Sequence, residues 1–306
     1  MKASPPPGRA RSALCVGQAT WDLCFIVDGY PAENAKVETE LLIESGGGPA
    51  ANAAWLLASW GVPTALATVL GDDDYGGRAL GELQQAGVDC RFAELLPNRR
   101  TPVSAIITNR SNGSRTIINR KTTSLALSRE VFPDFNPGLL LFDGHELAAS
   151  LAAMRAFPSA ITVLDAGSLR DGTRELSSRV DYLVCSQRFA AQVTGEPDVG
   201  THWQECVRQV RELNRGVAVV TLGEHGLAFD DGVEQGRLPA LAVKAADSTA
   251  AGDIFHGAFA YAVLQGMSLS ETLRLAKTAA GLSVQEFGGR PSIPMLAEVM
   301  ATMKHG

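Results

Sequence analysis

Short apolar segments rich in β-branched residues alternate with longer segments of helical periodicity along nearly the whole chain. Parallel strands need a crossover of helical length between them, so this alternation predicts an α/β fold. We expect a doubly wound, mostly parallel sheet flanked by helices. The predicted strands cover residues 13–16, 64–69, 139–142, 161–164, 182–185 and 218–221, and the predicted helices cover residues 49–60, 76–86, 147–156, 203–213, 252–264 and 269–287.

Two stretches break this alternation, because strands follow one another there without a helix between them. The first has predicted strands at 23–27 and 37–42, and the second at 103–108 and 116–119, with a turn at Asn112 and Gly113. We expect these strands to form a small separate sheet, a lid over the crevice at the strand ends. The predicted organisation is a disordered tail at 1–12 and an α/β domain at 13–306, with lid strands from about 23–43 and 100–122.

Composition and charge exclude several functional classes. The chain has 306 residues, a net charge of −6 and no stripe of Lys and Arg, which argues against a nucleic-acid partner. The N-terminus is too polar for a signal peptide, and no apolar stretch is long enough for a membrane span. The five cysteines include no Cys-x-x-Cys, so we expect reduced thiols, no protein-bound metal and a cytoplasmic location.

The segment DSTAAGD at 247–253, directly before an apolar helix, carries the sharpest chemical signal. Ala250, Ala251 and Gly252 have little side chain to keep an anion from the free backbone N–H groups at a helix N-terminus. Asp253 would lie beside that anion site, where it can accept a proton from a hydroxyl group. An acid in the first turn of a helix also stabilises the helix dipole without any chemistry, and this alternative stays open.

Two further glycine patterns are weaker. Gly46 and Gly47 precede a helix that contains Asn52, which has both a donor and an acceptor. This is not a P-loop, since no Gly-Lys-Ser/Thr follows, and a plain tight turn is the alternative.

The second pattern follows the predicted strand that ends at Thr221. Gly223 and Gly226 would form a turn there whose amides can hold nucleotide phosphates. A hairpin turn without ligand is the alternative.

Taken together from about residue 13 to residue 295, these motifs resemble the ribokinase (PfkB) family of carbohydrate kinases. DSTAAGD is similar to the family's D-T-x-G-A-G-D, and Gly46, Gly47 and Asn52 match its di-glycine and asparagine. The family's sugar-gripping carboxylate is matched by Asp22 in GQATWD. The turns GDDDYG at 71–76 and TLGEHG at 221–226 match the family's G-x-D-x-x-G and T-x-G-x-x-G.

The resemblance implies a set of roles and cofactors. Asp253 would be the catalytic base, and residues 250–252 would form an anion hole. The family uses Mg-ATP, often with an activating monovalent cation such as K⁺. The implied nucleotide-side residues are Thr221, Gly223, Gly226, Ser186, Ala280 and Ser283.

The chain departs from the family pattern at two places. Ala250 replaces the first glycine of G-A-G-D, which narrows the amide pocket. The family's N-x-x-E motif should fall at 186–189, where the chain reads SQRF, without the Asn or the Glu. We therefore expect Mg²⁺ to be held mainly through ATP and water.

Within the family, the chain resembles sulfofructose kinases and, more loosely, ketohexokinases. Lys36 and Asn119 match two residues that grip the sulfonate in the former, but His145 stands near the place of a third ligand, an arginine. His is the poorer ligand for a sulfonate. Lys36 as a solvated surface residue and His145 as a structural residue remain alternatives.

The predicted function is ATP-dependent phosphorylation of a hydroxyl group on a ketose or related small carbohydrate. The alternatives are a nucleoside kinase and a non-catalytic ligand-binding relative. The expected partners are the sugar and ATP, together with a second copy of the chain, because pairing two lids would cover their open sheet edges.

Overall fold

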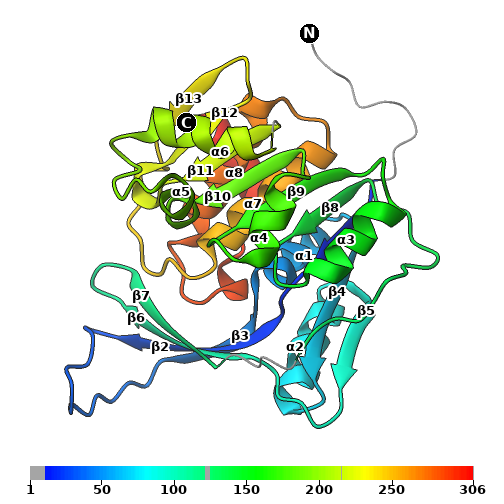
Figure 1. Cartoon of the computed structure of the whole chain (residues 1–306). Helices are drawn as coiled ribbons and strands as arrows, with labels where there is room; N and C mark the ends of the chain where they lie inside the picture. The colour runs from blue at the N-terminus through cyan, green and yellow to red at the C-terminus, as the bar shows by residue number, and fades with distance from the viewer. Residues whose placement is uncertain (1–10, 121–124, 215, 306) are drawn as a thin grey trace.

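Residues 11–120, 125–214 and 216–305 are described in the computed structural model of the protein (Figure 1). Residues 1–10 of the predicted tail and the last predicted lid residues, 121 and 122, lie outside them. The strands are β1 (Ala13–Val16), β2 (Thr20–Val27), β3 (Leu42–Gly47), β4 (Thr64–Gly71), β5 (Asp89–Leu96), β6 (Val103–Asn109), β7 (Ser114–Arg120), β8 (Leu139–Phe142), β9 (Ile161–Ala166), β10 (Tyr182–Ser186), β11 (Val217–Thr221), β12 (Leu227–Asp230) and β13 (Gln235–Leu238).

The helices connect and cover these strands. They are α1 (Pro49–Ser59), α2 (Asp74–Gln85), α3 (Leu147–Ala156), α4 (Asp171–Ser177), α5 (Gln187–Thr194), α6 (Trp203–Asn214), α7 (Ala251–Leu264), α8 (Leu269–Ser283) and α9 (Leu296–His305), with 3-10 turns η1 (Gly223–His225) and η2 (Arg290–Ser292). None of the helices in the described ranges is both long and apolar enough to cross a bilayer.

The large sheet has nine strands in the order β13-β12-β11-β10-β9-β8-β1-β4-β5. The strands from β11 to β5 are parallel, and β12 and β13 add antiparallel strands at one edge. Because parallel strands end at the same edge, the segments that follow β1, β8, β9, β10 and β11 meet there. The predicted doubly wound α/β fold is confirmed.

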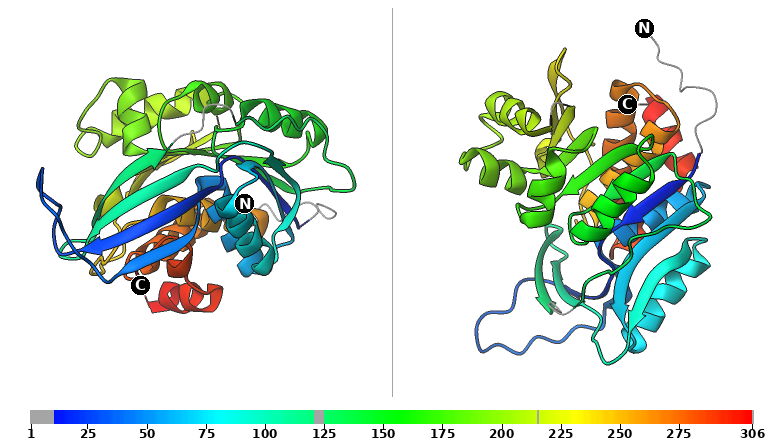
Figure 2. Two further views of the ribbon diagram at one scale, coloured as in Figure 1. Left: turned by 90° about the horizontal axis from the view of Figure 1, so that it is seen from below. Right: turned by 45° about the vertical axis from the view of Figure 1, so that its right-hand side comes forward.

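Alternating side chains of the strands fill two cores, one on each face of the large sheet. In β1, Ala13 and Cys15 belong to the core under α1, α7 and α8, whereas Leu14 and Val16 belong to the core under α3, α5 and α6. Every one of these side chains is fully buried. Strands covered on both faces read as continuous apolar runs, which is why they were recognisable in the sequence. Figure 2 shows the helices on both sides of the sheet.

The small sheet has four strands in the order β3-β2-β6-β7 and lies below the large sheet in Figure 1. The predicted strand at 37–42 is wrong, because β3 begins only at Leu42, which pairs with Phe25. Val37 and Leu41 are 47% and 45% exposed in the preceding loop, so their apolar–polar alternation is not matched by burial. The alternative of a plain tight turn at Gly46 and Gly47 is wrong as well, since both belong to β3.

The last predicted helix is too long. α8 ends at Ser283 rather than at residue 287. The carbonyl oxygen of Val284 accepts hydrogen bonds from the backbone N–H groups of Ala246 and Asp247, at 2.7 and 3.1 Å. The loop before α7 thus takes the place of the next helical turn. Sequence patterns also missed β5, β13, α4, α5 and α9.

A substitution at Phe259 in α7 tests the packing of the core that supports the site. Its side chain is fully buried, and its ring contacts Tyr182 at 5.5 Å and Phe255 at 6.3 Å between centroids. Phe259→Ala should lower the free energy of unfolding by about 3–5 kcal/mol, measured by chemical denaturation. Val233→Ala, at a side chain 96% exposed, should change it by less than about 0.5 kcal/mol. Equal effects of the two variants would contradict this description of the core.

Candidate active site

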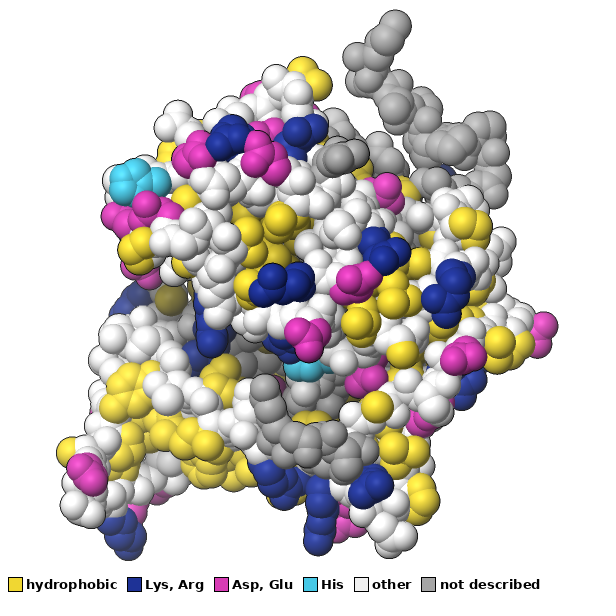
Figure 3. Space-filling view, in the orientation of Figure 1, with side chains coloured by type: hydrophobic (Ala, Val, Ile, Leu, Met, Phe, Trp, Pro, Cys, Tyr) yellow, Lys and Arg dark blue, Asp and Glu magenta, His cyan; other side chains and the backbone are white. Residues whose placement is uncertain are grey.

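A cleft of about 420 Å³ lies between the carboxyl edge of the large sheet and the small sheet. Figure 3 shows the surface hollowed between these two parts. The small sheet contributes residues of β2, β6 and β7. The large sheet contributes the ends of β9, β10 and β11 and the segments after β1, β8 and β9. Crevices at this edge are where open α/β sheets bind ligands.

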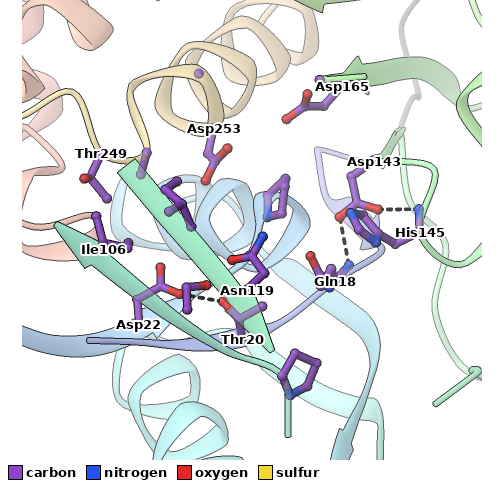
Figure 4. Close-up of a pocket in the computed structure, with 18 of the residues that line it drawn as sticks. Gln18, Thr20, Asp22, Ile106, Asn119, Asp143, His145, Asp165, Thr249 and Asp253 are labelled. Carbon is purple, nitrogen blue, oxygen red and sulfur yellow. Dashed lines mark hydrogen bonds between the residues drawn. The ribbon is translucent and has the colours of Figure 1, made fainter. Parts of the chain in front are cut away.

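Asp253 lines this cleft from the first turn of α7, and Figure 4 shows its carboxylate pointing into the space toward the small sheet. Ala250 and Gly252 line the cleft beside it. Ala250 has a left-handed backbone (φ 58°), which a side chain disfavours and which starts the turn into the helix. The N–H of Ala251 donates to the carbonyl oxygen of Ser248 at 3.4 Å, and Ala251 itself does not line the cleft.

The carboxylate of Asp253 is in an unusual electrostatic setting. Burial, followed by the nearby charge of Asp165, raises the pKa of Asp253 to about 7. The side-chain amide of Asn52 opposes this shift, since its Nδ2 donates to Oδ2 of Asp253 at 2.7 Å. Asn52 is buried in α1 and does not line the cleft. Asn52 therefore contacts Asp253 from the protein interior and not from the cleft.

Asp22 faces the cleft from β2, on the opposite wall (Figure 4). Its Oδ1 accepts a hydrogen bond from the Thr20 hydroxyl at 2.9 Å. Burial raises the pKa of Asp22, and hydrogen bonds from Ser104 and Thr20 oppose that shift. A Cβ atom on Gly47 would lie 2.0 Å from the Asp22 carboxylate, so only glycine leaves room for it there.

Asp143 was not predicted as a site residue. It is 2% exposed, and its carboxylate accepts from the backbone N–H groups of Gln18 (2.8 Å), Ala50 (3.2 Å) and His145 (2.9 Å). It therefore joins the ends of β1 and β8 to the start of α1. A carboxylate directly after a buried strand was the signal that could have identified it.

Another acidic group, Asp165, faces the cleft from the end of β9. The carboxylate of Asp165 lies 3.3 Å from Nδ1 of His256. Burial raises the pKa of Asp165. His256 also contacts the carbonyl oxygens of Gly252 (2.6 Å) and Val184 (3.1 Å), so it ties α7 to β10. Arg170 lines the cleft next to these groups, with Nη1 against the His145 ring.

The predicted nucleotide-side residues divide into two groups. Ser186 and Thr221 line the cleft at the ends of β10 and β11. Gly223, Gly226, Ala280 and Ser283 do not line it. A Cβ atom on Gly226 would lie 2.0 Å from the carbonyl oxygen of Leu238, so packing alone explains this glycine. The hydroxyl of Ser283 is buried and donates to the carbonyl oxygen of Ala280 at 2.9 Å.

The predicted substrate-side residues divide in the same way. Asn119 and His145 line the cleft, as Figure 4 shows. Lys36 does not, because it lies in the loop between β2 and β3 with its side chain 84% exposed, paired with Glu38 at 2.7 Å. Gly46 faces away from the cleft toward Arg290, and the adjacent Gly48, which was not predicted, lines it.

The described residues contain no group of three or more His, Cys, Asp or Glu side chains that could hold a metal ion.

Comparisons with known proteins agree with this geometry. The model of the pfkB family carbohydrate kinases matches residues 10–296. The ribokinase of Arabidopsis thaliana is 28% identical over 95% of this chain and 80% of its own length. A nucleoside kinase of Methanothermobacter thermautotrophicus is 25% identical over 95% of this chain and 94% of its own.

Among solved structures, the Arabidopsis ribokinase complexed with ribose and ATP superposes with a TM-score of 0.80 at 26% identity, covering 96% of this chain and 99% of that one. The family match spans both sheets and the residues around the cleft. The chain therefore belongs to the pfkB family of carbohydrate kinases, and it is a phosphotransferase.

Proposed function

We propose that this kinase transfers the γ-phosphoryl group of ATP to a hydroxyl group of a small sugar, with Asp253 as the general base. The observation that carries the proposal is the position of the Asp253 carboxylate in the cleft, at the N-terminus of α7 and opposite Asp22. A carboxylate whose pKa lies near neutral pH is well matched to proton abstraction at that pH.

The residues of the cleft have separate tasks in this proposal. Asp22, with Thr20 and Asn119, binds the sugar hydroxyl groups from the small sheet. The acceptor hydroxyl donates its proton to Asp253 as its oxygen attacks the phosphorus atom. The backbone N–H groups of Ala250 and Gly252, which line the cleft, stabilise the negative charge on the transferred group, as helix N-termini do.

The nucleotide is proposed to lie along the ends of β10 and β11, where Ser186 and Thr221 face the cleft. Of the three described arginines that line the same cleft, Arg115 and Arg170 offset phosphate charge. Mg²⁺ would neutralise the phosphate oxygens when bound, with ATP and water as its main ligands. The requirement for K⁺ is tested by replacing it with a larger organic cation in the assay.

The sugar itself is best found with an ATP-consumption screen. Pentoses come first, because the relatives are named ribokinases, followed by ketohexoses, sulfofructose and nucleosides. The predicted ketose preference and the nucleoside alternative give opposite orders of kcat/KM in this screen. Turnover of none of these acceptors would contradict the proposed function.

Asp253→Asn should retain nucleotide binding and lower kcat by about 10²–10⁴-fold, because the amide cannot take the proton. Titration calorimetry with ATP and steady-state kinetics measure the two effects. The matched control is Asp74→Asn, which neutralises an acid in the first turn of α2, outside the cleft. Wild-type kcat in Asp253→Asn would leave Asp253 with only the helix-dipole role.

The pH dependence of kcat/KM follows from the raised pKa of Asp253. The base works only when ionised, so activity should be half-maximal near pH 7, approach a plateau at higher pH and fall as the pH drops below it. An ordinary Asp would keep the enzyme active down to about 4. A pH profile that stays flat down to that lower value would contradict the assignment.

Gly47→Ala should raise the KM for the sugar and leave the KM for ATP nearly unchanged. The added methyl group would meet the Asp22 carboxylate at 2.0 Å and displace it from the cleft wall. Gly77→Ala is the control, since nothing lies within 4 Å of its Cβ position in α2. Equal KM values for the sugar in both variants would show that Asp22 does not bind it.

We also propose a homodimer that pairs the small sheets. β3 and β7 are the edge strands of this sheet, and Leu42 and Ile118 on them are 47% and 62% exposed. Exposed edges with apolar side chains favour pairing with another chain. Sedimentation should show a dimer that Ile118→Asp dissociates, whereas a wild-type monomer at micromolar concentration would contradict this proposal.

A further inference from the structure

Arg290 is a buried cation behind the cleft. It begins the 3-10 turn η2 and is 3% exposed. Its Nη1 donates to Oε2 of Glu82 in α2 at 2.9 Å, and its Nε donates to Oδ1 of Asn52 at 3.2 Å. A Cβ atom on Gly46 would lie 1.8 Å from Nη1, so the glycine in β3 makes room for the guanidinium. Burying a charge is costly unless it is paired in this way.

Only one orientation of the Asn52 side-chain amide satisfies the hydrogen-bond donors and acceptors of Arg290, Asn52 and Asp253. A guanidinium only donates hydrogen bonds, so the Asn52 side chain must turn its oxygen toward Arg290. Its Nδ2 then faces Asp253 and donates to Oδ2 at 2.7 Å. If the amide were flipped, its NH₂ group would face the guanidinium and its oxygen would face the carboxylate. Asn52 therefore presents a donor to Asp253 because Arg290 is behind it.

Other charged groups surround both ends of this chain of contacts. Asp253 is also influenced by Asp165 on β9, by His256 on α7 and by Arg115 on β7. Of these, Asp165 favours the protonated form of Asp253, and the two others favour the ionised form. On the Arg290 side, the acidic groups are Glu82 on α2, Asp22 on β2 and the thiol of Cys90 on β5.

We propose that Arg290 is a positioning residue for the catalytic base, holding the Asn52 amide in the orientation that donates to Asp253. This inference rests on the proposed role of Asp253. A hydrogen bond to the ionised form of a carboxyl group favours that form. Arg290 thereby lowers the pH down to which Asp253 remains available as a base.

The first test compares the pH dependence of kcat/KM for the sugar in wild type and Arg290→Met. The variant should move the midpoint of the acid limb up by about one pH unit, because Asn52 is then free to turn its oxygen toward Asp253. Below the midpoint this is about a tenfold loss of kcat/KM, and activity should recover at high pH. A lower rate with an unchanged midpoint would overturn the proposal.

A double-mutant cycle with Asn52→Leu separates positioning from a structural role. Asn52→Leu removes the donor and should shift the midpoint by itself. Adding Arg290→Met to Asn52→Leu should then cause no further shift, since Arg290 acts through the amide. A shift by Arg290→Met that persists undiminished in the Asn52→Leu background would contradict the inference.

Two more variants at Arg290 serve as a conservative control and as a substitute if Arg290→Met does not fold. Arg290→Lys retains a donor and should keep the wild-type midpoint, whereas a midpoint as high as in Arg290→Met would count against the proposal. If Arg290→Met does not fold, Arg290→Gln takes its place. Its amide can present either an oxygen or an NH₂ group to Asn52, so a smaller upward shift is expected, and an unchanged midpoint contradicts the proposal.

The control for loss of a partly buried arginine is Arg211→Met. Arg211 pairs with Asp230 at 3.4 Å and does not line the cleft. Arg211→Met should lower the free energy of unfolding without changing the midpoint of the acid limb of kcat/KM.

A readout independent of turnover distinguishes this inference from the proposed function. The carboxyl ¹³C resonance of Asp253, assigned with Asp253→Asn, can be titrated in wild type and in Arg290→Met. A higher pKa of Asp253 in Arg290→Met supports the positioning role even if no sugar is turned over. Identical titration curves would overturn the inference while leaving the kinase proposal intact.

Discussion

The hydrogen bond from Asn52 to Asp253 joins α1 to α7, two helices 201 residues apart at this point of the chain. It can form because the helices pack closely: a Cβ atom on Gly257 would lie 3.2 Å from the Cα atom of Ala53. Small residues at this contact bring the amide within reach of the carboxylate. The geometry of the site therefore depends on helix packing in the core under one face of the large sheet.

Several buried or partly buried aspartates line the cleft, and their burial changes their acidity. Asp22, Asp165 and Asp253 all line it, and burial raises the pKa of each. Such perturbed groups cluster at functional sites because catalysis needs them. The buried Arg290 offsets part of this charge from behind β3, where a substrate cannot reach it.

Much of the fold could be predicted from the sequence, because strands buried on both faces and amphipathic helices leave local patterns. β1, β8 and α3 have the predicted bounds. The prediction of a strand at 37–42 was wrong because the apolar–polar alternation is a local pattern, whereas burial depends on contacts with distant segments. α8 was predicted too long for the same reason, since its end depends on a loop that bonds to Val284.

The places of Ala250, Gly252 and Asp253 in the cleft were predictable because the signal is concentrated in one short segment, but Ala251 of the same segment does not line the cleft. It was not predictable where function depends on contacts between distant residues. Asp143 and Arg290 carry no motif of their own, and their partners lie on other elements. Lys36 has the right residue type for an anion ligand, but its loop holds it in solvent away from the cleft.

The most direct test of the account is a crystal structure of the protein with ADP and the sugar found in the screen. The measured quantity is the distance from the Asp253 carboxylate to the nearest sugar hydroxyl. The account predicts a direct hydrogen bond of about 2.6–3.2 Å, with that hydroxyl directed at the phosphate site. A hydroxyl beyond the reach of even one bridging water would contradict it.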